Sequence, residues 1–188
     1  MPAEQTMAAL ADHGVTGKPI RIADHDVKTG ISTDLGDSDA WPGIRDTILV
    51  ADILVLSTPI RLGHLSSIAQ KVMERLNTEI SETDDEGRML TYGKVAAVCV
   101  VGNEDGAHKV SADLYQGLND AGFSLVPNAV TYWVGQAMQH TDYQGLDKTP
   151  EETATTKTLA ANTAHLARRL KANPDPPAWA HPGSSGEL

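Results

Sequence analysis

The stretch ADILVLSTPIRLGHLSSIAQKVMERL, residues 51–76, joins a strand-like pattern to a helix-like pattern through a short polar turn. Residues 52–57 are mostly apolar, which is typical of a short buried β-strand. Apolar residues then recur at helical spacing over 68–76, after a pair of serines that could cap such a helix. The sequence therefore predicts a strand, a turn over 58–64 and a helix in close succession.

The same alternation continues on both sides of this stretch. Strands alternating with helices predict an α/β domain with a parallel sheet, which we place at residues 1–172. The tail 173–188 is rich in Pro, Gly and Ser and is predicted to be disordered. The remaining predicted helices are 3–13, 41–50, a segment ending near Gly122, and about 150–172; the remaining predicted strands are 18–27, 94–102 and 124–135, the last with a kink at Pro127.

Composition excludes several classes of protein. The 188 residues carry a formal net charge of −10 and no dense basic patch, so neither nucleic acid nor an anionic membrane surface is an expected partner. Cys99 is the only cysteine, so no internal disulfide can form. Its apolar surroundings predict a small buried side chain rather than a reactive thiol. No apolar stretch approaches the roughly 20 residues of a membrane span, and no signal peptide is visible, so we expect a cytoplasmic protein.

Two loops follow predicted strands at the positions where parallel α/β sheets bind ligands, outside the carboxyl ends of the strands. The loop 58–64 combines a rigid proline corner with a flexible glycine. The loop 102–108 contains two glycines, which let a backbone approach a ligand closely, and His108, a hydrogen-bond donor. A plain strand-to-helix connection is an open alternative for 58–64, and Asp105 could be only a helix cap.

Other chemistries lack their sequence patterns. No pair of histidines shows the i, i+4 spacing of helical metal ligands and no cysteine joins them, so a metal site is not expected. The acidic run 84–86 is interpreted as a solvated loop. The nucleophile pattern G-x-S-x-G and the nucleotide patterns G-x-x-x-x-G-K-[ST] and G-x-G-x-x-G are all absent.

Residues 51–76 and the segment KVAAVCVVGNEDGAHKVSADLYQGLNDAGF, residues 94–123, resemble the flavodoxin-like NAD(P)H-dependent FMN reductases and quinone reductases. In that family an apolar strand ends in Thr-Pro, a loop with Gly follows, and the next helix carries a Lys and an acidic residue. Lys71 and Glu74 match this pattern. The resemblance covers roughly residues 3–172 and implies a flavodoxin-like, doubly wound parallel sheet.

The resemblance also implies FMN at the two loops. The reaction of that family would be hydride transfer from NAD(P)H to the flavin, followed by transfer of the reducing equivalents to a quinone, a flavin or a similar small-molecule acceptor. The flavin performs that chemistry, so no catalytic residue is predicted. Trp133 is a further candidate at the border of the pocket. The residues that the resemblance places at the flavin ring are Thr58, Pro59, Ile60, Arg61, Leu62 and Gly63 on one side, and Gly102, Asn103, Glu104, Asp105, Gly106 and His108 on the other.

The N-terminus departs from this family. Its members begin with a strand and a Ser/Thr-rich loop that wraps the FMN phosphate at a helix N-terminus. Here the sequence enters a predicted helix directly after Met1, so we expect the first strand and the phosphate loop to be absent from these 188 residues. Either the chain is part of a longer one, or the sheet closes differently, or a partner chain completes it.

Two other functions stay open. A flavodoxin-type electron carrier would suit the net charge of −10, but neither loop contains the aromatic residues with which carriers usually sandwich the flavin. A non-catalytic flavodoxin-like binding protein with an impaired phosphate site would suit the N-terminus. The family resemblance implies a homo-oligomer, either a dimer or a tetramer.

Overall fold

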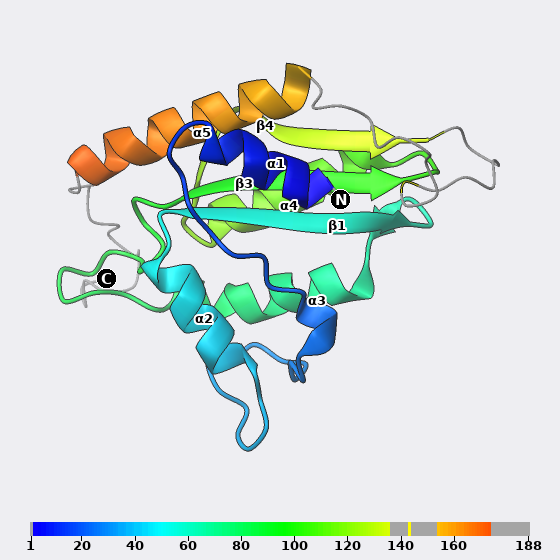
Figure 1. Ribbon diagram of the computed structural model, residues 1–188. Coiled ribbons are helices and arrows are strands. Elements are labelled where there is room, and N and C mark those ends of the chain that lie inside the picture. Colours follow the sequence, from blue (N-terminus) through cyan, green and yellow to red (C-terminus); the bar gives the residue numbers. More distant parts are fainter. Residues whose placement is uncertain (1, 136–142, 144–153, 174–188) are drawn as a thin grey trace, which may run out of the picture.

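The computed structural model describes residues 2–135, 143 and 154–173, and it places one sheet between two layers of helices (Figure 1). The sheet has the strand order β2-β1-β3-β4, in which β1, β3 and β4 are parallel and β2 is antiparallel to β1. The predicted α/β class with a parallel sheet is therefore confirmed. The elements are α1 (Pro2–Ala11), η1 (Ile22–Asp24), α2 (Trp41–Val50), β1 (Ile53–Arg61), β2 (His64–Leu65), α3 (Ser67–Leu76), η2 (Asn77–Ile80), β3 (Val95–Gly102), α4 (Ala107–Asp120), β4 (Ser124–Val134) and α5 (Ala154–Ala172).

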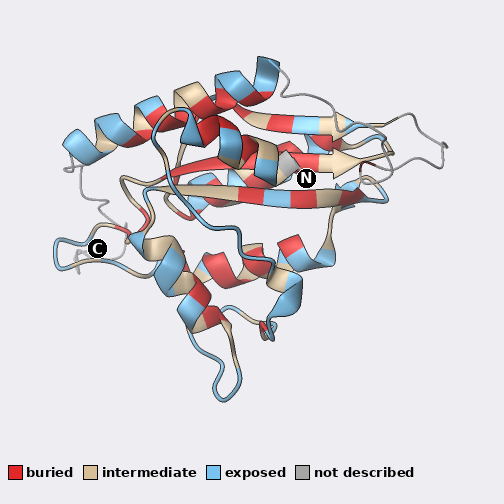
Figure 2. Ribbon diagram, in the orientation of Figure 1, coloured by how far each residue is buried: buried red, intermediate tan, exposed pale blue. Residues whose placement is uncertain are grey.

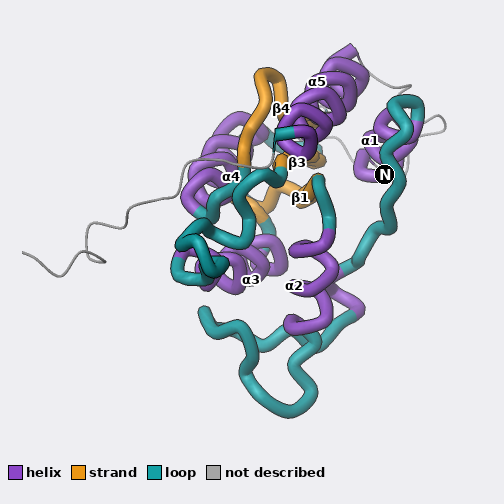
Figure 3. Tube along the Cα trace, turned by 90° about the vertical axis from the view of Figure 1, so that its left-hand side faces the viewer, coloured by secondary structure: helices purple, strands orange, loops and turns teal. Residues whose placement is uncertain are grey.

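Strand β3 lies at the centre of the core. Its residues from Val95 to Val100 have no exposed surface, because helices cover both faces of the sheet (Figures 2 and 3). The helices α2, α3 and α4 pack on one face, and α1 and α5 pack on the other. Cys99 points to the second face, where its sulfur lies 3.2 Å from the hydroxyl of Thr6. Burial raises the pKa of this thiol to about 11, as expected of an unreactive core cysteine.

Local sequence signals set several helix ends. Pro42 occupies the first turn of α2, where its missing N–H needs no partner. The side chain of Ser66 accepts a hydrogen bond from the Ala69 amide at 3.2 Å, so the predicted cap of α3 is confirmed. The predicted helix 150–172 is confirmed from Ala154 onward. Residues 150–153 and the tail from residue 174 lie outside the described residues.

The prediction for the end of strand β1 is wrong. The strand does not stop at Thr58-Pro59 but continues to Arg61, and a two-residue turn then leads into β2. The turn residues Leu62 and Gly63 both have positive φ, 51° and 74°, as a tight hairpin turn of this kind requires. The strand tolerates Pro59 because the missing N–H lies on the edge that faces away from β3.

The predicted strand 18–27 is not formed. Ile22–Asp24 form a short 3-10 helix, and the residues before it run as unpaired backbone. The alternating pattern is present in the sequence, but a strand needs a neighbour to pair with, and the described part of the chain offers none beside this segment. The kink predicted at Pro127 is confirmed as a shift of register between β3 and β4, with Asn128 at φ 56°.

A buried ion pair fastens the loop 28–40 to α3. The Arg75 guanidinium lies 2.8 Å from the Asp39 carboxylate, and neither side chain is exposed. Arg75 also donates to the carbonyl oxygens of Lys28 and Thr33, and its guanidinium carbon lies 5.5 Å from the ring centroid of Trp41. Burial by itself would raise the pKa of Asp39, but hydrogen bonds from the Trp41 and Lys28 amides and from Arg75 hold the pKa below its usual value.

We expect Asp39→Ala to lower the free energy of unfolding at pH 7 by about 3–5 kcal/mol, because it leaves the Arg75 charge buried without a partner. Urea denaturation measures this loss. The matched control is Asp37→Ala, an exposed carboxylate of the same loop, which should cost less than about 0.5 kcal/mol. Because the pKa of Asp39 is lower in the folded state, its contribution is present above about pH 4 and is lost as the pH falls further. The gap between wild type and Asp39→Ala should therefore narrow below pH 4, and an unchanged gap would contradict the assignment.

Candidate functional site

The two predicted loops meet at the carboxyl ends of β1 and β3. A Cβ atom added to Gly106 would lie 2.9 Å from the Gly63 Cα and 3.1 Å from the Gly63 carbonyl oxygen. Gly106 has φ 127° and stands immediately before α4, so both its conformation and its surroundings require glycine. The backbones of the two loops are therefore in direct contact at one rim of the sheet.

Polar contacts tie the same two loops together. The Glu104 carboxylate accepts a hydrogen bond of 3.0 Å from the Leu62 amide. Lys109, in the first turn of α4, lies 3.3 Å from the His64 ring nitrogen and 2.5 Å from the Asp113 carboxylate. These contacts join the β1–β2 turn to the start of α4.

Three of the predicted site residues support the rim from inside. The Thr58 hydroxyl is buried; it accepts from the Ser66 amide at 3.2 Å and donates to the Pro59 carbonyl at 3.1 Å, which connects β1 to the start of α3. Ile60 is fully buried in the core. A Cβ on Gly102 would lie 3.0 Å from the Ile60 side chain, so glycine at 102 makes room for that side chain.

Other predicted residues lie on the outer side of the rim. Leu62 is 90% exposed, and Arg61 is exposed and donates to the carbonyl of its neighbour Ile60. Asp105 accepts a hydrogen bond of 2.8 Å from the Gly106 amide. Gly106, not Asp105, is the residue that caps α4, so the alternative that Asp105 is the helix cap is wrong.

Tyr132 extends the rim and was not predicted. His108 lies against it, with Nε2 3.2 Å from the Tyr132 hydroxyl and the two rings edge to face at 5.4 Å. Trp133 turns to the opposite face of the sheet, where its ring contacts Tyr143 at 5.4 Å, as the alternation of a strand requires. That period of two is the sequence signal that could have chosen Tyr132 over Trp133 as the neighbour of His108.

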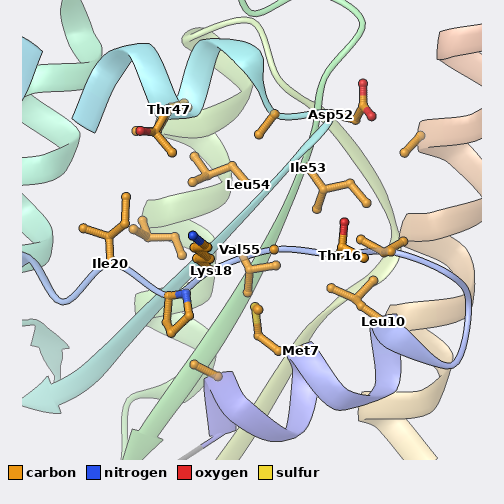
Figure 4. A pocket seen from close by; sticks show the side chains of 18 of the residues that line it. Met7, Leu10, Thr16, Lys18, Ile20, Thr47, Asp52, Ile53, Leu54 and Val55 are labelled. Atoms are coloured by element: carbon orange, nitrogen blue, oxygen red, sulfur yellow. The ribbon is translucent and has the colours of Figure 1, made fainter. Parts of the chain in front are cut away.

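A groove of about 760 Å³ lies away from this rim, along the edge of β1 (Figure 4). Side chains of β1, α1, α2 and the segment after α1 surround it, and most of its lining is apolar. Met7 and Leu10 reach it from α1, and Thr47 reaches it from α2.

Two further findings concern the described residues alone. No group of three metal-binding side chains lies close enough there to hold an ion. None of the helices in the described ranges has both the length and the apolar character needed to cross a membrane.

Comparison with known proteins identifies relatives with flavin in their names. Residues 1–139 match the family model described as NADPH-dependent FMN reductase. The chain is 35% identical over 172 residues to "8-demethyl-8-aminoriboflavin-5'-phosphate synthase" of Streptomyces davaonensis, a match that covers 86% of this chain and 67% of that protein.

Solved structures agree with this match. A crystal structure of RosB with the bound intermediate 8-demethyl-8-formylriboflavin-5'-phosphate superposes with a TM-score of 0.81 at 32% identity, over 92% of this chain and 73% of that one. The apo form of the NADH:FMN oxidoreductase EMOB superposes with a TM-score of 0.58 at 19% identity, over 96% of this chain and 82% of that one, which shows a shared fold. Together with the parallel sheet, these matches show that the chain is flavodoxin-like and belongs to the NADPH-dependent FMN reductase family.

Proposed function

We propose that this protein passes reducing equivalents from NAD(P)H through FMN to a quinone, a flavin or a similar small acceptor. Membership in the FMN reductase family supports a flavin-dependent oxidoreductase. The contact between Gly63 and Gly106 is the observation that carries the choice of site. It brings two backbones together at the carboxyl rim without side chains between them, where a flat ring could approach main-chain donors.

The residues at this rim fit such a ring. FMN, when bound, supplies the hydride chemistry, and the chain holds and orients it. We assign one wall to Pro59 and Arg61–Gly63, and the other to Gly102–Gly106. His108 and its hydrogen-bonded neighbour Tyr132 add a polar aromatic surface beside these walls. Thr58 and Ile60 do not face the rim. Their buried side chains hold the end of β1 in position, Thr58 by its hydrogen bond to the Ser66 amide and Ile60 by packing in the core.

Arg61 presents a cationic group at this rim that makes no ion pair among the described residues, whereas Lys109 is paired with Asp113. Its side chain is exposed, and the hydrogen bond to the neighbouring Ile60 carbonyl uses one of its five N–H donors. On a chain with a net charge of −10, a local cation is needed to favour an anionic dinucleotide. We therefore assign Arg61 to the encounter with NAD(P)H.

A second candidate function treats the flavin as substrate rather than cofactor. The observation that favours it is the 35% identity to a protein named as a synthase of an aminoriboflavin phosphate. The TM-score of 0.81 with RosB, whose structure holds a flavin phosphate intermediate, supports it further. The electron-carrier alternative is disfavoured, because the two loops contain no aromatic residue. His108, at the end of the second loop, contacts Tyr132 edge to face, so these two rings do not form the two walls of a flavin sandwich.

The reaction is tested with the purified chain, FMN and NADPH. The proposed function predicts quenching of FMN fluorescence on binding, and NADPH oxidation that requires both FMN and a quinone. Mass spectrometry of the flavin before and after turnover separates the two candidates. An unchanged flavin mass with NADPH consumption supports the oxidoreductase, whereas a new flavin mass supports the synthase. No FMN binding would contradict both.

We expect Gly106→Ala to weaken FMN binding by about tenfold or more, which corresponds to about 1.4 kcal/mol. The added Cβ meets the Gly63 backbone at 2.9 Å, so the two loops must move apart. Gly87→Ala is the matched control, because Gly87 also has a positive φ, 75°, but an added Cβ there has no neighbour within 4 Å. Both variants should lose stability, by about 1–2 kcal/mol from backbone strain, whereas FMN affinity should fall in Gly106→Ala alone. FMN affinity is measured by fluorescence titration. Equal affinity in the two variants would contradict the placement of FMN at the contact between Gly63 and Gly106.

A further inference from the structure

The last residues of β4 form an apolar surface that the described helices leave exposed. Val130, Tyr132 and Val134 alternate along the strand and share the face of the sheet on which α4 packs. Val130 packs against the core, whereas Tyr132 is 41% exposed and Val134 is 37% exposed. The change occurs because α4 begins at Ala107 and its second residue, His108, is already level with Tyr132. Val134 therefore lies past the start of the helix. We call Tyr132 and Val134 the apolar shelf.

The apolar shelf is continuous with one wall of the candidate site. Val134 is paired with Gly102 in the sheet, and the Gly135 amide donates a hydrogen bond of 2.9 Å to the Gly102 carbonyl oxygen. Gly102 has no side chain that could separate Val134 from the rim. Tyr132 meets the other end of the same loop through its contact with His108. The shelf thus lies directly beside the wall that the loop after β3 forms.

Two features suit the apolar shelf to an apolar ligand. Residues 124–135, which contain all of β4, include no charged residue, so a charged group would gain no partner from the strand. His108 also holds the Tyr132 ring in one orientation, with Nε2 3.2 Å from the hydroxyl and the two rings at 87° to each other. A ring that is already fixed loses little conformational entropy when an apolar group packs against it.

The shelf distinguishes between the acceptors of the proposed function by the group attached to the acceptor ring. A free flavin carries a hydroxylated ribityl chain, whose hydroxyl groups would lose hydrogen bonds to water on an apolar surface. An aliphatic tail on a quinone has no such hydrogen bonds to lose, and it gains free energy by leaving water. The shelf therefore favours a quinone with an aliphatic tail over a free flavin.

We propose that the apolar shelf binds the aliphatic tail of the electron acceptor, so that the preferred acceptors are quinones with such a tail. This inference rests on the proposed function and specifies its acceptor. The quinone ring would lie at the rim, and the tail would lie along β4 on Tyr132 and Val134. In the net reaction NAD(P)H and one proton are consumed, and the quinone gains two electrons and two protons to leave as the hydroquinone. Tyr132 and Val134 determine specificity and take no part in the electron transfer.

Steady-state oxidation of NADPH by the FMN-loaded protein, with two benzoquinones that differ only in a pentyl tail, measures this selection. The KM of the wild type should be at least about tenfold lower for the tailed quinone, because burial of two methylene groups corresponds to about that factor. The kcat should be similar for both quinones, because a contact made equally before and during the reaction changes KM alone. Equal KM values for the two quinones would overturn the proposal.

Variants of the shelf locate the bound tail. Val134→Ser should reduce the ratio of the two KM values to below about threefold, because the apolar surface that covers the tail is largely removed. Tyr132→Ala should reduce the ratio as well. Tyr132→Phe should preserve it, since the ring stays and only the hydroxyl is lost. The ratio compares two acceptors in the same variant, so a general loss of FMN affinity or of folded protein cancels.

Val50→Ser is the matched control for Val134→Ser. Val50 is 83% exposed at the end of α2, just before the start of β1 and so at the opposite rim of the sheet. The variant should keep the KM ratio of the wild type. An unchanged ratio in Val134→Ser, or a ratio lost in Val50→Ser, would refute the shelf as the site of the tail.

NMR titration separates failure of this inference from failure of the proposed function. The ¹⁵N-labelled protein with FMN, and without NADPH, is titrated with the pentyl benzoquinone. The amides of Tyr132 and Val134 should shift, and the amide of Val50 should not. Shifts at the shelf without any NADPH oxidation would support the shelf and contradict the proposed reaction. NADPH oxidation with no shift at Tyr132 or Val134 would support the reaction and overturn the shelf.

Discussion

The contact between the backbones of Gly63 and Gly106 is the constraint on which the candidate site depends. Strand β3 is buried on both faces and pairs directly with β1, so the chain leaves these two strands at neighbouring points of one rim. The loops that follow could still diverge from there. They remain together because two glycines allow main chain to touch main chain, and because Glu104 accepts the Leu62 amide. The rim is therefore formed mainly by backbone, a surface on which a flat ligand can lie.

At the carboxyl end of β1, some residues are buried and support the rim, whereas others are exposed to solvent. Thr58 and Ile60 point inward, where the hydroxyl anchors α3 and the aliphatic side chain packs under Gly102. Arg61 and Leu62 point outward into solvent. A substitution at the inward positions would change the shape of the rim through packing. A substitution at the outward positions would change what the rim presents to a ligand. Under the proposed function, the sequence motif Thr-Pro-x-Arg-x-Gly combines this structural role with the binding of the flavin.

The layout of the fold could be predicted from sequence wherever local pattern and burial agree. The apolar run around Cys99 indicated a strand covered on both faces, and Ser66 indicated the start of α3. Predictions failed where pairing decides the structure. Residues 18–27 carry a strand pattern but have no strand beside them, and Pro59 marked an apparent stop that an open sheet edge tolerates. A sequence pattern indicates which side chains of a segment would be buried. It does not indicate whether a neighbouring strand is available for the segment to pair with.

Long-range contacts of the site were also beyond sequence reasoning. Nothing local links Glu104 to the Leu62 amide or His108 to Tyr132, since these pairs are 42 and 24 residues apart. The same holds for the Arg75–Asp39 pair that fastens the loop 28–40. The order of the elements predicted that the two loops would share a rim. The side-chain contacts that connect the loops could be identified only from the structure.

Titration of ¹⁵N-labelled protein with FMN, followed by NMR of the backbone amides, tests the central claim most directly. We expect the largest shifts to fall on the amides of Leu62, Gly63, Gly102 and Gly106, and the amides of Gly87 and of the start of β3 to stay unchanged. Shifts confined to the groove along the outer edge of β1, or no shift at either glycine of the contact, would contradict it.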